Sequence, residues 1–148
     1  MQKGTYYAKE IPTDDSYWEF DTAVKPVTVA VAQTAEVTFT NTHYGRIEIR
    51  KTTNTGNQLG GWTFRVRDSK GNSYGDFTTD DNGYACTQNL PLGRYTAVEL
   101  PTEDNYWLTE LGFHDVTVKA GETTVDTWLN KEQGLAWFYK KTIPGLSL

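Results

Sequence analysis

The sequence predicts an all-β fold, a sandwich of two sheets, and three observations favour it. Thr, Gly, Tyr and Val are frequent, and these residues favour strands and turns. Short stretches alternate between apolar and polar residues, with turn sequences between them. No stretch has the period of a helix. With 148 residues, of which 37% are apolar, the chain can form one domain with a real core or two small ones.

The predicted strands follow one another through short turns. The first of them, "RIEIRK" at 46–51, places Ile47, Ile49 and Lys51 on one face of a strand. Further strands are expected at 62–68, 84–90, 94–100, 114–121 and 123–130. Turns are expected at 68–72, 80–83 and 120–121. About seven short strands with frequent turns are typical of a β-sandwich.

One phrase occurs twice, as "GTYYAKEIPTDDSYW" at 4–18 and as "GRYTAVELPTEDNYW" at 93–107. The offset of 89 residues continues without a gap and pairs Asn41 with Asn130; 19 of the 53 positions aligned in this way are identical. Such a run indicates tandem duplication. We therefore expect a window from a longer array: the C-terminal half of one repeat at 1–43, a complete repeat at 44–133, and the first strand of a third at 134–148.

Composition argues against several kinds of partner. The formal net charge is −5 and no basic stripe exists, which disfavours nucleic acid. The longest apolar run, "GLAWFY" at 134–139, is too short to insert across a membrane, and neither a signal peptide nor a sorting signal is expected. Cys86 is the one cysteine, so no internal disulfide is expected. His43 and His114 are isolated in the sequence, and neither a metal nor a cofactor is expected.

Three polar residues interrupt strand faces that are otherwise apolar. Lys51 follows two isoleucines, Glu99 follows an aromatic residue and an alanine, and Asn130 follows a tryptophan and, earlier on the same face, an aspartate. Each by itself is more simply explained by a strand end that reaches water, because Lys and Glu are rarely buried unpaired. Their joint occurrence on the first, a middle and the last strand favours buried groups that satisfy one another, since each alone would be costly to bury.

Several motifs of the complete repeat point to a known family. They are Gly45 with Lys51 six residues on, "QLGGWTF", "TDDNG", "LPLGRYTAVE" and a last strand that ends at Asn130. In this composite pattern, 44–133 resembles the Cna B-type repeat of Gram-positive surface adhesins and pilins, also described as SpaA-like. The resemblance implies an Ig-like, prealbumin-like sandwich and a location outside the cell, on the cell wall. Trp62 stands where the family usually has a small residue, a difference expected to affect packing more than chemistry.

The resemblance also implies an isopeptide bond between Lys51 and Asn130, formed autocatalytically with the help of Glu99. The chemistry is sensible, because burial lowers the pKa of a lysine and an amine attacks only when neutral. Burial also favours a protonated Glu99, which we expect to polarise the Asn130 carbonyl and to move protons as ammonia leaves. The reaction occurs once per molecule, so the protein is not expected to be an enzyme with turnover.

The flanking segments carry parts of a second such site. Glu10 and Asn41 stand 89 residues before the Glu and Asn of the complete repeat, and Lys140 stands 89 residues after its Lys. Neither flank can bury its apolar residues alone. We expect the tail of one molecule to complete the N-terminal half of another in a strand-swapped homo-oligomer. A second cross-link between Lys140 and Asn41, assisted by Glu10, would make that oligomer covalent.

Two functions fit these expectations. The first is a structural spacer in an adhesin stalk or pilus shaft, whose partners are neighbouring repeats of the same protein. The alternative is an adhesive domain that recognises a host surface protein. Repeats with one register and short turns leave little room for an elaborate binding site, which favours the spacer.

Overall fold

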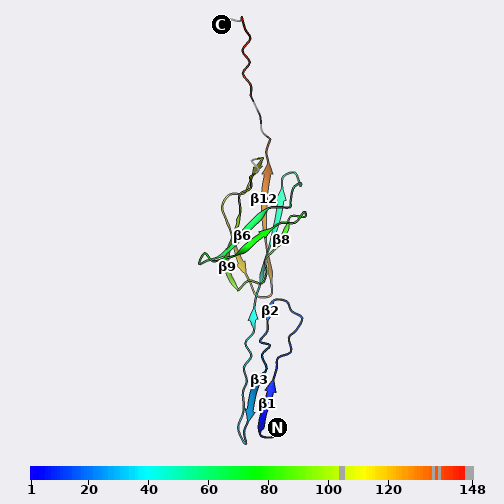
Figure 1. Cartoon of the computed structure of the whole chain (residues 1–148), viewed down its shortest axis with the longest axis vertical. Helices are drawn as coiled ribbons and strands as arrows, with labels where there is room; N and C mark the ends of the chain where they lie inside the picture. Colours follow the sequence, from blue (N-terminus) through cyan, green and yellow to red (C-terminus); the bar gives the residue numbers. More distant parts are fainter. Residues whose placement is uncertain (104–105, 135, 137, 146–148) are drawn as a thin grey trace.

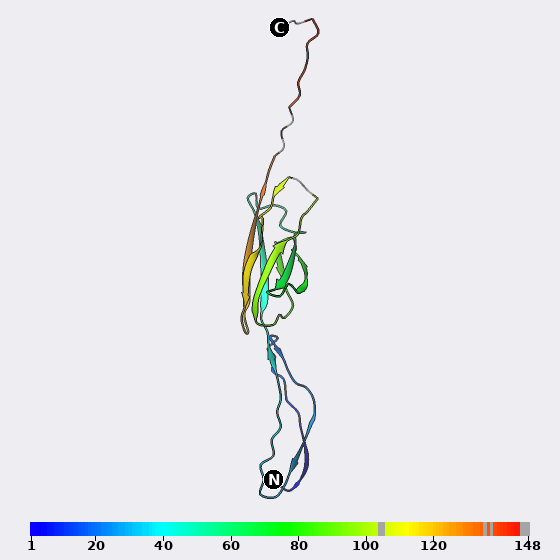
Figure 2. The same ribbon diagram turned by 90° about the vertical axis from the view of Figure 1, so that its left-hand side faces the viewer.

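The computed structural model describes residues 1–103, 106–134, 136 and 138–145. Residues 46–132 form a sandwich of two four-stranded sheets, one in the order β10-β12-β5-β8 and the other in the order β11-β9-β6-β7 (Figures 1 and 2). The strands are β5 Arg46–Thr53, β6 Thr63–Asp68, β7 Ser73–Thr78, β8 Tyr84–Cys86, β9 Gly93–Glu99, β10 Trp107–Leu108, β11 His114–Val118 and β12 Thr123–Glu132. The predicted all-β sandwich is confirmed. The described residues include no helix, and so none that could cross a membrane.

Two of these strands, β7 and β10, have no counterpart in the sequence prediction. β7 pairs with β6 across the predicted turn at 68–72, and Gly75 within it has a φ of 125°. It is an edge strand with one partner, and its residues are exposed or half-buried, so it lacks the apolar alternation by which strands are recognised. β10 is two residues long, too short to leave a periodic pattern.

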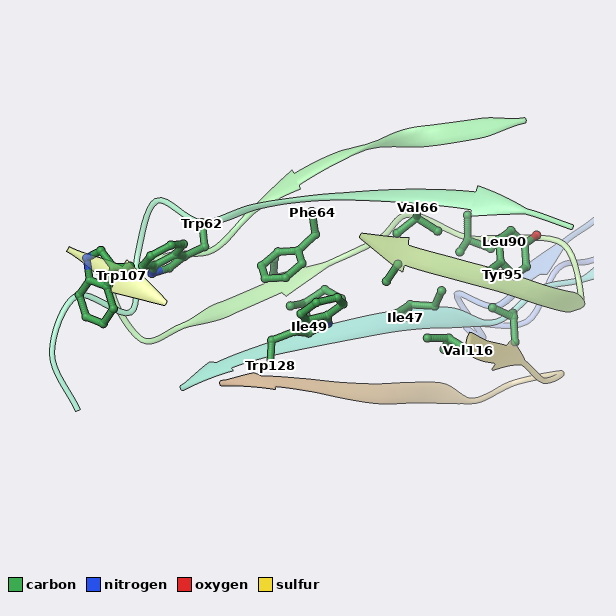
Figure 3. Packing of buried hydrophobic residues seen from close by; sticks show 13 residues of the cluster. Ile47, Ile49, Trp62, Phe64, Val66, Leu90, Tyr95, Trp107, Val116 and Trp128 are labelled. Atoms are coloured by element: carbon green, nitrogen blue, oxygen red, sulfur yellow. The ribbon is translucent and has the colours of Figure 1, made fainter. Parts of the chain in front are cut away.

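The core lies between the two sheets and follows the alternation seen in the sequence. Ile47 and Ile49 of β5 face Phe64 and Val66 of β6, and all four are fully buried (Figure 3). Trp128 of β12 closes the same layer, with its ring centre 5.3 Å from that of Phe64. Because side chains on a strand alternate between faces, the residues that continue these rows must also enter the core.

The first and last strands of the sandwich lie side by side and run parallel. β12 pairs with β5 over eight positions, with Lys51 opposite Trp128 and Thr53 opposite Asn130. Asn130 is two residues beyond Trp128, so it lies on the same face of the sheet as Lys51. The parallel pairing also sends the chain into the sandwich at one end and out at the other (Figure 1).

Residues 1–43 form a slender extension of four short strands: β1 Gly4–Ala8, β2 Trp18–Glu19, β3 Lys25–Val29 and β4 Thr42–His43. β1 pairs with β3 in the register of β9 with β11, and β2 pairs with β4 in the register of β10 with the end of β12, at the same offset of 89 residues. The extension has no described counterpart of β5 to β8. Its apolar residues therefore all stay half-buried or exposed.

The extension meets the sandwich through Tyr17 and Gly45. The Tyr17 hydroxyl lies 2.7 Å from Thr123 Oγ1, and its main-chain oxygen accepts a hydrogen bond from Tyr44. Gly45 must be small, because a Cβ there would lie 2.2 Å from the main-chain oxygen of Lys119. The junction therefore combines side-chain contacts of the extension with a close approach of main chain at Gly45.

The predicted strand at 134–148 is not formed in the described part of the tail. Residues 136 and 138–145 are exposed and assigned to no strand, while residues 135, 137 and 146–148 of the predicted strand lie outside the described residues. A strand persists only when a neighbour accepts its main-chain hydrogen bonds, and no described segment lies beside the tail (Figures 1 and 2).

Candidate functional site

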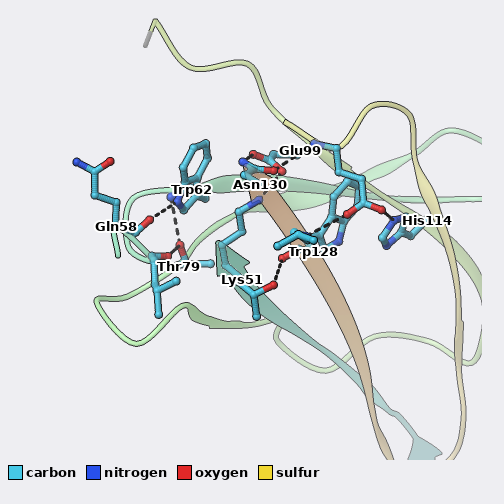
Figure 4. Close-up of polar contacts among 12 residues, drawn as sticks. Lys51, Gln58, Trp62, Thr79, Glu99, His114, Trp128 and Asn130 are labelled. Carbon is cyan, nitrogen blue, oxygen red and sulfur yellow. Dashed lines mark hydrogen bonds and ion pairs between the residues drawn. The ribbon is translucent and has the colours of Figure 1, made fainter. Parts of the chain in front are cut away.

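Lys51, Glu99 and Asn130 come together in the core at one end of the sandwich (Figure 4). Lys51 Nζ donates to Glu99 Oε2 at 2.8 Å, and Asn130 Nδ2 donates to Glu99 Oε1 at 2.6 Å. Their exposed fractions are 2%, 9% and 0% respectively. The simpler explanation, that each reaches water at a strand end, is therefore wrong for all three. The carboxylate bridges an amine and a carboxamide that belong to neighbouring strands.

The environment of Lys51 favours a neutral amine. Burial is the largest influence on the pKa of Lys51 and lowers it below the ordinary value for lysine, while the hydrogen bond and charge of Glu99 act in the opposite direction. Since only the neutral amine is a nucleophile, this environment prepares Lys51 for attack on a carbonyl carbon.

Trp62 covers the amine of Lys51. Its ring centre is 4.7 Å from Nζ, its Nε1 donates to the main-chain oxygen of Gln58, and its ring packs edge-on against Trp107. These contacts agree with the expectation that Trp62 affects packing, and through that packing the indole helps to bury the amine. Gly83, from the "TDDNG" turn, approaches on another side; its φ is 77°, and a Cβ there would lie 2.4 Å from the main-chain oxygen of Lys51.

The Asn130 carbonyl faces a donor that the sequence did not indicate. The main-chain N–H of Glu110 donates to Asn130 Oδ1 at 3.1 Å. An N–H can only donate, so the atom it faces is the carbonyl oxygen and the atom on Glu99 is the amide nitrogen. Glu99 therefore lies on the leaving nitrogen rather than on the carbonyl oxygen that we expected it to polarise.

His114 is not isolated in the fold, although it appears so in the sequence. Its Nδ1 lies 2.7 Å from Asp126 Oδ1, its Nε2 lies 3.2 Å from Glu110 Oε1, and its ring stacks on Trp128 at 3.8 Å. Asp126, the aspartate that broke the pattern of the last strand, is buried and also accepts from Trp128 Nε1. In the sequence, this cluster was indicated only by Asp126, a carboxylate on the same strand face as Asn130.

Glu10 and Asn41 also meet, within the N-terminal extension. Asn41 Nδ2 donates to Glu10 Oε1 at 2.6 Å, as Asn130 does to Glu99. Glu10 Oε2 is buried and has no hydrogen-bond partner among the described residues, whereas the equivalent oxygen of Glu99 holds Lys51. Lys140 is exposed in the tail and is not brought to this pair.

The sandwich thus carries a buried lysine, glutamate and asparagine on its first, a middle and its last strand. The family model for the SpaA prealbumin-like fold domain matches residues 45–132, and the chain belongs to that family. A search of curated proteins gave no match.

Solved structures of similar fold include pilins and the Bacillus anthracis TIE protein. The minor pilin GBS52 of Streptococcus agalactiae is 15% identical with a TM-score of 0.56, and the match covers 95% of this chain and 65% of that one. The Bacillus anthracis TIE protein is 23% identical with a TM-score of 0.53, covering 75% and 20%. BcpA, the major pilin subunit of Bacillus cereus, is 17% identical with a TM-score of 0.52, covering 84% and 41%. The chain thus spans between a fifth and two thirds of the length of these proteins.

Proposed function

We propose that this chain is part of the stalk or shaft of a bacterial cell-surface adhesin or pilin, outside the cell, and that an isopeptide bond between Lys51 and Asn130 stabilises it. The observation that carries the proposal is the contact of one buried carboxylate, Glu99, with both the amine and the carboxamide. Such contacts hold two reacting groups in place, and intramolecular effective molarities of about 10⁵ M or more make an otherwise slow amide exchange feasible.

The reaction has a simple balance. A proton passes from Lys51 Nζ to Glu99, the Nζ–Cγ bond to Asn130 forms, the Cγ–Nδ2 bond breaks, and the leaving nitrogen takes a proton from Glu99. One ammonia is released and Glu99 ends as it began, so the site acts once and needs neither a cofactor nor an oxidant.

The position of the bond suits a stalk. Lys51 and Asn130 lie on adjacent parallel strands near the end at which the chain leaves the sandwich. Pulling on the two ends would load β5 from its start and β12 from its end, and the bond would carry the force from one to the other. The bond also closes a loop of ~80 residues, which in the chain-entropy model stabilises the fold by about 4.5 kcal/mol.

The test is the intact mass of the purified chain. We expect the monomeric chain to have a mass lower than that of the printed sequence by one ammonia. The Glu99→Ala and Glu99→Gln variants should keep the full mass, whereas Glu103→Ala, which alters an exposed carboxylate, should lose ammonia as the unmodified chain does. An unmodified chain of full mass would refute the cross-link, and bond formation at the normal rate in both Glu99 variants would refute the role of Glu99.

The alternative, an adhesive domain for a host protein, gains less support. A hollow of about 500 Å³ is lined by residues that include Trp62, Trp107 and Asp81. The two indoles are only 5% and 9% exposed, because they turn into the core. They offer little aromatic surface to a ligand, so the spacer remains the better proposal. Binding of extracellular-matrix proteins by the unmodified chain, lost on Asp81→Ala, would reverse this preference.

We further propose that Glu10 and Asn41 are a second cross-link site that lacks its lysine. What supports this is the buried Glu10 Oε2 without a partner in the described part of the chain. Lys140 is the lysine of these 148 residues in the matching position, and the neighbouring Phe138 and Tyr139 are 94% and 88% exposed. In this proposal the tail of one copy enters the N-terminal half of a second copy, and Lys140 joins Asn41.

Light scattering after size exclusion, followed by denaturing gels, tests this second site. We expect oligomers that survive denaturation, and that Lys140→Arg removes them while the adjacent Lys141→Arg does not. A strictly monomeric chain refutes the strand swap. Oligomers that dissociate on the gel refute the intermolecular bond and leave the swap standing.

A further inference from the structure

The carbonyl oxygen of Asn130 is where negative charge must develop when Lys51 attacks. The described donor at that oxygen is the main-chain N–H of Glu110, at 3.1 Å. We infer that this N–H is the oxyanion donor of the cross-linking reaction, and that the Glu110 side chain, held by His114 and by the Leu129 N–H, positions it. This inference rests on the proposed cross-link and assigns to the site two residues beyond the Lys, Glu and Asn.

Glu110 lies in the loop between β10 and β11, and its side chain ties that loop to the strand that carries Asn130. Glu110 Oε2 accepts from the main-chain N–H of Leu129 at 3.0 Å, and Oε1 contacts His114. His114 is held in turn by Asp126 and by its stack on Trp128, both on β12. The N–H donor and the carbonyl that it serves are therefore both tied to β12, because Glu110 binds the N–H of Leu129, the residue before Asn130.

Ionic contacts stabilise this arrangement of the loop and β12 near neutral pH. The Leu129 N–H, followed by His114, holds the pKa of Glu110 below its ordinary value against the effect of burial, so its carboxylate stays ionised. Burial acts to lower the pKa of His114, but Asp126 and Glu110 outweigh it and the net shift is upward. The groups that face His114 are thus two carboxylates, one from the loop and one from β12.

The N-terminal extension contains the same device built from different residues. The main-chain N–H of Asp21 donates to Asn41 Oδ1 at 2.9 Å, and the Asp21 side chain binds the Lys25 ammonium and lies 3.5 Å from the Thr40 N–H. Lys25 lies over the ring of Phe39.

The residues of the extension that form these contacts each stand 89 positions before their counterparts in the sandwich. In order, Asp21, Asn41, Lys25, Thr40 and Phe39 correspond to Glu110, Asn130, His114, Leu129 and Trp128. Of these five pairs of equivalent positions, four carry different residues in the extension and in the sandwich. What is unchanged is the asparagine and the main-chain N–H on its carbonyl oxygen. A contact that survives so much change in its surroundings is explained by a requirement at that oxygen. Stabilisation of an oxyanion is such a requirement, since a preorganised donor acts where charge appears in the transition state.

The step divides the work between two groups. As the Nζ–Cγ bond forms, the carbonyl electron pair moves to Oδ1, where the Glu110 N–H receives it. When the pair returns, the Cγ–Nδ2 bond breaks and Glu99 protonates the leaving nitrogen. Glu99 contacts Nδ2 and not Oδ1 in the structure, which suits this division.

The test measures the rate of ammonia loss by intact mass after cell-free synthesis of the full chain. Replacing Glu110 by its α-hydroxy acid analogue removes the N–H and keeps the side chain, and should slow the reaction about 100-fold or more. Glu110→Ala keeps the N–H but frees the loop and should slow it about 10-fold, and Glu110→Gln should slow it less. The α-hydroxy acid analogue of Leu111, an exposed neighbour, is the matched control and should react at the unmodified rate.

The near-UV circular dichroism of the tryptophans checks that each variant has folded before its rate is compared. If the folded ester variant at position 110 reacts as fast as the unmodified chain, the N–H is not the oxyanion donor. His114→Phe should keep the stack on Trp128 and lose the part of the pH dependence of the rate that His114 causes, while the part set by the Lys51 amine remains; an unchanged pH profile would overturn the positioning role. If the unmodified chain loses no ammonia, it is the cross-link itself that fails, which separates the two proposals.

Discussion

The complete sandwich and the N-terminal extension place equivalent residues in equivalent pairings, but only the sandwich has strands β5 to β8 to cover them. Glu99 and Glu10 each accept a hydrogen bond from an asparagine, and each asparagine carbonyl faces a main-chain N–H. Lys51 donates a hydrogen bond to the second carboxylate oxygen of Glu99, whereas the second oxygen of Glu10 receives none from any described residue. The comparison shows that hydrogen-bond geometry survives the loss of half a domain, while burial of the core does not.

The largest expected effect is a difference in protease resistance between the two regions. Trypsin should cut after the exposed Lys9 of the extension orders of magnitude faster than after Arg67, which is also exposed but lies within β6 of the sandwich. Cleavage within a paired strand requires opening of the core, whereas the extension has little core to open. Timed digestion followed by mass spectrometry measures both cuts. Equal rates would mean that 44–133 is no independent unit.

A second prediction concerns the glycines at the two ends of the sandwich, which are 89 residues apart. Gly45→Ala should lower the free energy of unfolding by about 3 kcal/mol, because its Cβ would meet the Lys119 main-chain oxygen. Gly134→Ala should change it by less than about 0.5 kcal/mol, since no atom lies within 4 Å of the added Cβ. Urea titrations of both variants compare them directly. Similar losses would show that the junction is not closely packed.

A third prediction uses pH to separate the two regions, because His114 belongs to the sandwich and its counterpart Lys25 to the extension. The folded pKa of His114 is raised, so its stabilising contribution is complete below the ordinary histidine pKa of about 6.5 and is lost as the pH rises through the folded value. The unfolding free energy of the sandwich should therefore fall across that range. His114→Gln should flatten the curve measured by thermal unfolding, and a curve that falls equally in this variant would assign the effect to another group.

The smallest effect is expected at the surface of the sandwich. Arg65 and Asp76 form a two-pronged ion pair at 2.7 Å, and both are more than a third exposed. Arg65→Ala should cost far less stability than loss of the buried Lys51–Glu99 pair, and the difference from the unmodified chain should shrink in high salt. Thermal unfolding at two salt concentrations measures it. A salt-independent loss would mean that Arg65 acts through packing.

Much of the candidate site could be predicted because strand residues alternate strictly. Lys51, Glu99 and Asn130 each continued a row of core residues, so their burial followed from the rows that contain Ile49, Ala97 and Trp128. Glu110 could not be found in this way, because it acts through its main chain from a loop and the type of its side chain carries no signal. His114 needed Asp126 and Trp128 beside it, and these are neighbours only after β11 and β12 pack together.

The parallel pairing of β12 with β5 has a consequence for the order of events in the life of the molecule. The asparagine lies on the last strand of the sandwich to be synthesised and the lysine on the first. A nascent chain therefore lacks the asparagine until that strand is made, and a complete but unfolded chain contains both residues without the site. Under the proposed chemistry, only a chain that has finished folding can lose ammonia. The mass of each molecule would then show whether it had once reached its native state, and this could be measured even after the molecule has been denatured.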